Sequence, residues 1–199
     1  EDDMKTLGMN TLGPHSPTWW YQGSVAPYIH VCRFVDISHY MTPDESDFLD
    51  VFSDEFVAHC EAKAREIVIP KKEDPYLLGY SMTDCPVLTD YEALPRDNNI
   101  FGKTRIGLPT WPRVLRNLGS DRPGKATYVR TMRRIYRDEI AAFNRTYLTA
   151  FKSFDELLRA RSWRPLVELG NRLEARDNQA FLLRILDRCY EVEVAAIRR

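Results

Sequence analysis

The segment that most constrains the fold is a short apolar run, Tyr76-Leu-Leu-Gly-Tyr-Ser-Met82, which ends in the polar residues Thr83-Asp-Cys85. Pro75 and Pro86 bound the run at the length of one strand. Because its apolar residues are nearly continuous, it predicts a parallel strand that is covered on both faces. Such sheets place their chemistry just beyond the carboxyl ends of the strands, where the three polar residues lie. From the pattern alone, those residues fit a plain turn with a capping aspartate equally well.

Two earlier segments also predict strands. Pro27 to Val35 is rich in β-branched and aromatic residues, and Asp36 and His39 follow its end. Met9 to Leu12 predicts a short strand, which follows a helix that stops at Gly8. Because the carboxyl ends of parallel strands meet at one edge, the polar residues that follow them are expected to lie on one face.

The helical segments alternate with these strands. The sequence predicts a helix within Asp50–Pro70 that Ser53 or Asp54 can cap and that buries a stripe of small and aromatic residues, namely Phe56, Cys60 and Ala64. Strands that alternate with helices predict βαβ units and a parallel sheet. Further helices are expected at Thr127–Tyr136, at Asp138–Tyr147, after the capping box Ser153-Phe-Asp-Glu156 and over Ala175–Arg199. The apolar face of the last helix is expected to be covered by a sheet.

Two loops are unusual in length or composition. The segment from Pro86 to about Lys125 is rich in proline and glycine, and connections this long are usually lids, binding loops or disordered inserts. Trp111 within it argues against a wholly disordered insert. The other loop carries Trp19 and Trp20, which either stack on sugar or base rings or pack onto the domain.

Composition narrows the classes of partner. Acidic and basic residues nearly cancel, 29 against 28, so nothing in the overall charge favours nucleic acid. No run approaches the roughly 18 apolar residues of a membrane span. The four cysteines lack metal-ligand spacing, so we expect free thiols, no metal and no cofactor. A nucleophilic role for Cys85 lacks a partner base in the sequence.

Four segments, taken in order, carry a resemblance to a known family. They are Gly8-Met-Asn-Thr-Leu-Gly13, Asp50-Val-Phe-Ser-Asp-Glu-Phe56, Asp74-Pro-Tyr-Leu-Leu-Gly-Tyr80 and Asn144-Arg-Thr-Tyr-Leu-Thr-Ala-Phe-Lys-Ser-Phe-Asp-Glu-Leu157. Together they resemble the middle of an agarase-like glycoside hydrolase, from the clan of retaining (β/α)8-barrel enzymes that use two glutamates. The third segment looks like the fourth strand of such a barrel.

The resemblance implies an α/β fold, a partial (β/α)8 TIM-type barrel of parallel strands. Residues 1–199 would form part of one catalytic-type domain, with residues 86–170 as an inserted loop and helical segment after the third visible strand. The rest of the barrel would lie outside residues 1–199. The resemblance also suggests a secreted or periplasmic protein and a carbohydrate substrate.

The position of the family's catalytic acid departs from the expected pattern. In such relatives the fourth strand ends in Asp-Asn-Glu, in which the glutamate is the acid/base and the asparagine holds a sugar hydroxyl. Here Thr83, Asp84 and Cys85 occupy those positions. A thiol is a poor substitute for a carboxylic acid that must protonate a leaving-group oxygen. The family's nucleophile, a later glutamate, would lie beyond Arg199.

Three hypotheses follow. The first is an active hydrolase of a polysaccharide or oligosaccharide, in which Asp84, or else Asp90 or Glu92 of the next loop, has become the general acid. The second is a carbohydrate-binding barrel that has lost the chemistry, and the third is an unrelated α/β domain. The residues expected to line the sugar cleft are Asn10, His15, Trp19, Trp20, Asp36, His39, Cys85 and Trp111.

Overall fold

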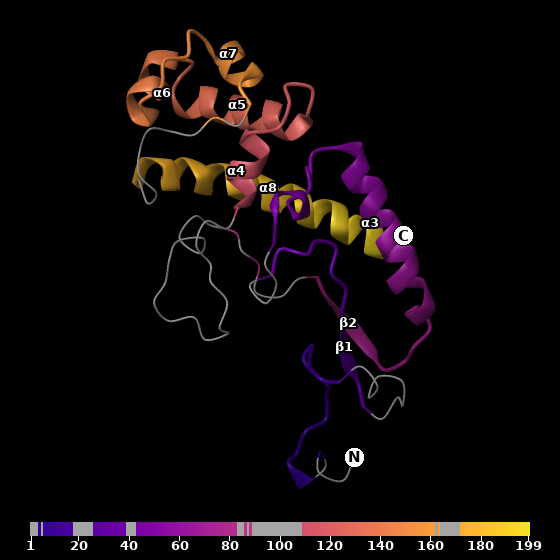
Figure 1. Ribbon diagram of the computed structural model, residues 1–199. Helices are drawn as coiled ribbons and strands as arrows, with labels where there is room; N and C mark the ends of the chain where they lie inside the picture. The colour runs from indigo at the N-terminus through magenta and orange to yellow at the C-terminus, as the bar shows by residue number, and fades with distance from the viewer. Residues whose placement is uncertain are drawn as a thin grey trace.

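The computed structural model describes residues 4, 6–17, 26–38, 43–82, 86, 88, 109–161, 163 and 172–199. Within these residues the chain combines helices with one parallel sheet of two strands. Figure 1 shows the small sheet at one end of the structure and the later helices gathered at the other. Among the described helices, none is both long and apolar enough to cross a membrane.

The sheet pairs two of the three predicted strands in the predicted direction. β1 (Tyr28–Val31) lies parallel to β2 (Leu77–Ser81). The expected strand at Met9–Leu12 is reduced to a parallel bridge between Leu12 and Tyr28. β1 is shorter than predicted because the chain leaves the ladder after Cys32, whose N–H donates to the Ser81 carbonyl at 2.8 Å.

Within the described residues, the apolar run at residues 76–82 is not covered on both faces. Tyr80 and Met82 pack against the main core, whereas Leu78, on the same side of the strand, is 62% exposed. The helical layer therefore covers only the carboxyl-terminal half of this face of β2.

α3 (Asp54–Ile67) confirms the helix predicted from local signals. The Ser53 hydroxyl accepts a hydrogen bond from the Phe56 N–H at 3.2 Å and caps the first turn. Phe56, Cys60 and Ala64 form the buried stripe, as predicted. Two short 3-10 helices flank α3: η1 (Glu45–Asp47) precedes it, and η2 (Ile69–Lys71) leads from it towards β2.

The segment after the long loop folds into short helices. They are α4 (Trp111–Arg116), α5 (Pro123–Ile135), α6 (Ile140–Tyr147) and α7 (Phe154–Arg159). At α7 the predicted capping box is half formed, because Ser153 caps Glu156 while the Glu156 carboxylate accepts from the Lys152 N–H instead of the Ser153 N–H. The boundary proposed for an insert at residues 86–170 stays a prediction, and these helices share one hydrophobic core with α3.

α8 (Arg172–Arg198) is the longest described helix, and its apolar face is covered differently from the prediction. It packs chiefly against helices, namely α3, α4, α5 and α6, rather than against a sheet (Figure 1). Its first half is also fixed by buried polar contacts. Arg116 of α4 forms an ion pair with Glu174 at 2.7 Å, and the Tyr147 hydroxyl donates to the Asp177 carboxylate at 2.9 Å. These contacts join α8 to the helices that precede it.

Candidate functional site at the strand ends

The segments that follow β1 and β2 meet just beyond the sheet. Ser38 and Pro86 form an isolated antiparallel bridge, although they belong to different βα connections. Asp36 is exposed beside this bridge, in the segment that follows β1. The structure thus brings together the two chain segments that carry the candidate residues, as expected for parallel strands.

Several candidate residues lie outside the described part of the chain. They are Trp19, Trp20, His39, Asp84 and Cys85, together with the alternative acids Asp90 and Glu92. Their assignments therefore stay predictions. The bridge between Ser38 and Pro86 flanks three of them in sequence, because His39 follows Ser38 and Asp84-Cys85 precede Pro86.

Asn10 and His15 are both exposed and lie around Leu12. Leu12 pairs with Tyr28, the first residue of β1, so Asn10 lies towards the amino end of the sheet. The Asn10 side-chain oxygen accepts a hydrogen bond from the neighbouring Thr11 hydroxyl at 3.0 Å. His15 follows Leu12 within a turn closed by the hydrogen bond from Ser16 N–H to Gly13 O. Neither residue is described in contact with the bridge between Ser38 and Pro86.

Trp111 is buried at the start of α4, with 1% of its surface exposed. Its indole N–H donates to the Leu49 carbonyl at 2.8 Å, and its ring meets Phe48 edge to face. A ring packed in this way does not present a face on which a sugar can stack. Its assignment to the sugar cleft stays a prediction that this burial does not favour.

Burial raises the pKa of the Glu193 carboxyl to about 7, the kind of shift that often marks a catalytic acid. The side chain is only 2% exposed, however, and it faces the interior between α8 and α3, where a polymer cannot reach. The sequence does carry a signal for its burial, because Glu193 follows Cys189 by four residues on the apolar stripe of α8.

The described cysteines are free thiols, as the sequence predicts, and all three are buried. Burial raises the pKa of the Cys32 thiol to about 11 and that of Cys60 to about 12, and it raises the pKa of Cys189 as well. Thiols with such pKa values carry almost no thiolate at neutral pH and are poor nucleophiles. Within the described residues, no cluster of three or more His, Cys, Asp or Glu side chains is arranged to hold a metal ion.

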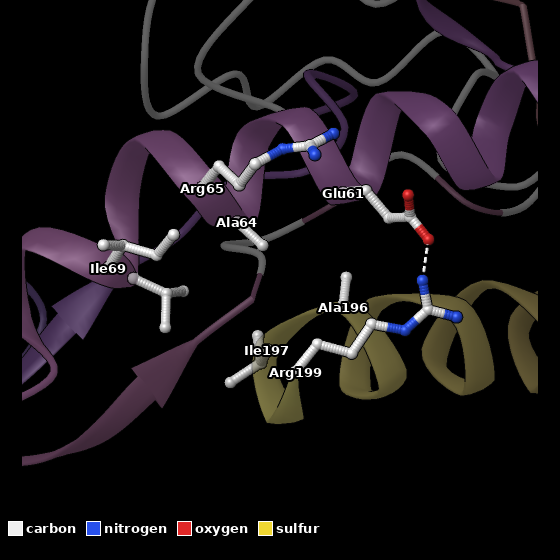
Figure 2. A pocket seen from close by; sticks show the side chains of 8 residues that line it. Glu61, Ala64, Arg65, Ile69, Ala196, Ile197 and Arg199 are labelled. Carbon is white, nitrogen blue, oxygen red and sulfur yellow. Dashed lines mark hydrogen bonds and ion pairs between the residues drawn. The ribbon is translucent and has the colours of Figure 1, made fainter.

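A groove of ≈ 260 Å³ lies between the C-terminal ends of α3 and α8 (Figure 2). Because α3 runs back from the end of β1 to the start of β2, this groove lies towards the amino ends of the strands. It is therefore remote from the edge where a barrel enzyme places its chemistry. Its lining consists of Glu61, Ala64, Arg65, Val68, Ile69, Ala196, Ile197 and Arg199.

No protein-family model matches the chain, and no curated protein sequence matches it. Solved structures do match. The agarase AgWH50C aligns with 99% of this chain at 18% identity and a TM-score of 0.66. The fold of the chain is agarase-like. PfGH50B aligns with 98% of the chain at a TM-score of 0.63, and an exo-beta-agarase aligns with 98% at 0.65, both at 18% identity.

The likeness covers nearly all of this chain but a small share of each of these three structures. The chain spans 26% of the length of AgWH50C, 26% of PfGH50B and 25% of the exo-beta-agarase. At this level of identity, the comparison establishes a shared fold for this portion, and activity has to be argued from the site.

Proposed function

We propose that this chain is part of a (β/α)8-barrel glycoside hydrolase-like protein that acts on a polysaccharide or oligosaccharide. The agarase-like fold supports the proposal, as does the parallel pairing of β1 with β2. The observation that carries it is the bridge between Ser38 and Pro86, which joins the segments beyond both strand ends. In a barrel enzyme this is the face on which substrate binds.

The proposed general acid is Asp84, displaced by one position from the acid of agarase-like relatives. Its task is to protonate the glycosidic oxygen as the bond to the sugar breaks, which requires a carboxyl that stays protonated near the working pH. A nucleophilic glutamate, expected outside residues 1–199, would attack the sugar from the opposite face. Asp36 and His39, which lie close to Ser38 in the sequence, are proposed to contact sugar hydroxyls.

The test is the activity of the full-length protein, which includes the rest of the proposed barrel, on agarose and related glycans. Asp84→Asn is the decisive variant. We expect Asp84→Asn to lower kcat/KM on the natural polymer by roughly 10²- to 10⁴-fold, the usual contribution of a general acid. An aryl glycoside with an acidic leaving group needs no protonation, so its cleavage should fall far less. Equal losses on both substrates, or none, would remove Asp84 from this role.

The loop carboxylates provide matched controls for that variant. Asp90→Asn and Glu92→Gln remove a carboxylate of the following loop while Asp84 is kept. Under the proposal, both variants retain cleavage of the polymer. If one of them, rather than Asp84→Asn, shows the selective loss on the natural substrate, that residue is the acid.

The second candidate function is a carbohydrate-binding barrel without catalysis. It is favoured by the cysteine at the position where relatives carry the acid/base glutamate, because a thiol does not donate a proton effectively to an alkoxide leaving group. Calorimetric binding of oligosaccharides by a full chain that hydrolyses none of them would establish this function in place of the first.

A further inference from the structure

A buried carboxyl group lies at the junction between α8 and α3. Glu193 is 2% exposed, and Cys189 contacts it one turn earlier on α8, with its Sγ 3.2 Å from Glu193 Oε1. Among the residues that the structure describes, no Lys, Arg or His side chain forms an ion pair with it. A thiol is a weak hydrogen-bond donor, so the ionised form of this carboxyl is poorly stabilised.

The titratable groups that face Glu193 are uncharged at neutral pH. Cys60 approaches from α3, Cys32 from the segment after β1, and Cys189 and Tyr190 from α8 itself. Burial raises the pKa of each of these four groups.

The other titratable groups described near this cluster lie beside Cys32 rather than beside Glu193. Lys63 of α3 lies near Cys32 and lowers the pKa of its thiol, although burial raises it by more. Tyr80 of β2 also lies near Cys32. The helices α4 and α6 place their polar contacts on Glu174 and Asp177, at the other end of α8. No charged neighbour is therefore described that compensates a negative charge on Glu193.

We propose that Glu193 makes the packing of the last turns of α8 on α3 pH-sensitive. When the carboxyl is neutral, it packs among the thiols and α8 stays docked. When it ionises, the cost of a buried, unpaired charge favours an opening that lets water reach it.

The opening would act on the groove shown in Figure 2. Ala196 and Arg199 lie within two turns of Glu193, and both line the groove. The Arg199 guanidinium is paired with Glu61 of α3 across the two helices, as the figure shows. Undocking of α8 would break this ion pair and expose the apolar floor of the groove. The pH response is therefore expected in the C-terminal turns of α8, and not in its first half.

The direction of the effect follows from the two pKa values. Burial raises the pKa of Glu193 from its ordinary value of 4.5 to about 7 in the docked state. The docked state therefore binds more protons than the open state between these two values. The stability of the docked state therefore falls as the pH rises through this window, and it is lowest once the pH exceeds the docked pKa.

The experiment is hydrogen exchange of the α8 amides in the full chain at pH 6 and pH 8, corrected for intrinsic rates. We expect the opening constant of residues 189–198 to rise roughly tenfold between the two pH values, as linkage to a single carboxyl requires. Glu193→Gln, a neutral isostere, should abolish the rise. Glu191→Gln is the matched control, because Glu191 is an exposed carboxylate paired with Arg188, and this variant should respond as the wild type does.

Two results would overturn the proposal. One is a pH response that Glu193→Gln leaves unchanged, and the other is the absence of a response in the wild type. Carbon-13 NMR titration of the Glu193 carboxyl in the wild type keeps the test decisive even if the variant fails to fold. A midpoint near 4.5 would contradict the proposal, and a midpoint near 7 would support it.

Discussion

The Asp50 carboxylate accepts a hydrogen bond from the Gly124 backbone N–H at 2.9 Å, across 74 residues of sequence. Asp50 is 7% exposed and also accepts from the Phe52 N–H at 3.1 Å. The residue at the N-cap of α5, Arg122, provides no side-chain hydrogen bond to that helix. Asp50 therefore supplies, from the loop before α3, the negative charge and the acceptor that the first turn of α5 needs.

We expect Asp50→Ala to lower the free energy of unfolding by about 1–3 kcal/mol, because it leaves the buried Gly124 N–H without an acceptor. Denaturant unfolding at neutral pH measures the loss. Asp54→Ala removes an exposed aspartate from the first turn of α3 and should cost only a few tenths of a kcal/mol, roughly the value of a surface charge near a helix end. Equal costs for the two variants would contradict the capping role of Asp50.

Gly124 tests the same contact from the other side. A Cβ atom at this position would lie 2.6 Å from the Asp50 Oδ1 atom and 3.0 Å from the Leu115 Cγ atom. Gly124→Ala should therefore displace Asp50 and destabilise the fold by roughly 1–3 kcal/mol, as overpacking commonly does. At Gly13 an added Cβ would meet no atom within 4 Å, so Gly13→Ala should be close to neutral. Equal melting temperatures for the two variants would contradict the close approach of Gly124 to Asp50.

The sequence predicts the parts of this fold that depend on neighbouring residues. α3 was predicted because its cap at Ser53 and its stripe of Phe56, Cys60 and Ala64 lie within one short segment. The predicted start of α5, at Thr127, is four residues late, because the acceptor that stabilises the true start is Asp50. No local pattern reveals a cap that arrives from such a distance.

For the candidate site, the sequence predicts which chain segments meet but not how each side chain is packed. The parallel pairing of β1 and β2 implied that the segments after them meet, and the bridge between Ser38 and Pro86 agrees with this. The burial of Trp111 was not predictable, because a tryptophan in a proline-rich loop has the same sequence pattern whether it is exposed or packed. Its environment is decided by the Leu49 carbonyl and the Phe48 ring, which lie more than 60 residues earlier.

Lys125 provides a prediction on the pH dependence of stability. Its ammonium group is fully buried and donates to the carbonyls of Arg116 and Ala160, at the ends of α4 and α7. Burial lowers the pKa of Lys125 to about 8, so the unfolded chain binds more protons than the folded one between pH 8 and an ordinary lysine pKa of 10.5. Stability relative to Lys125→Met should therefore rise with pH across this window, by up to roughly 3 kcal/mol.

A neutral amine retains two N–H donors, which match the two carbonyl acceptors, so deprotonation of Lys125 need not sacrifice either hydrogen bond. Denaturant unfolding of the wild type and of Lys125→Met at pH 7.5 and pH 10 gives the difference directly. Lys152→Met replaces an exposed lysine and should show a difference that does not change with pH. A wild-type advantage that shrinks as the pH rises would show that the sign assigned to Lys125 is wrong.

Leu78 tests the proposal that a longer barrel covers this sheet. It is the second residue of β2 and is 62% exposed, and an apolar residue on a short open sheet favours association between chains. We expect residues 1–199 alone to self-associate and Leu78→Thr to reduce this, because threonine keeps the strand propensity while it removes apolar surface. Leu183→Gln, at a position of α8 that is 58% exposed, should have little effect on association.

In a complete barrel Leu78 would be buried, so Leu78→Thr should destabilise the full chain. Sedimentation velocity over a range of concentrations measures the association, and a monomer that unfolds in one cooperative transition would contradict the expected exposure.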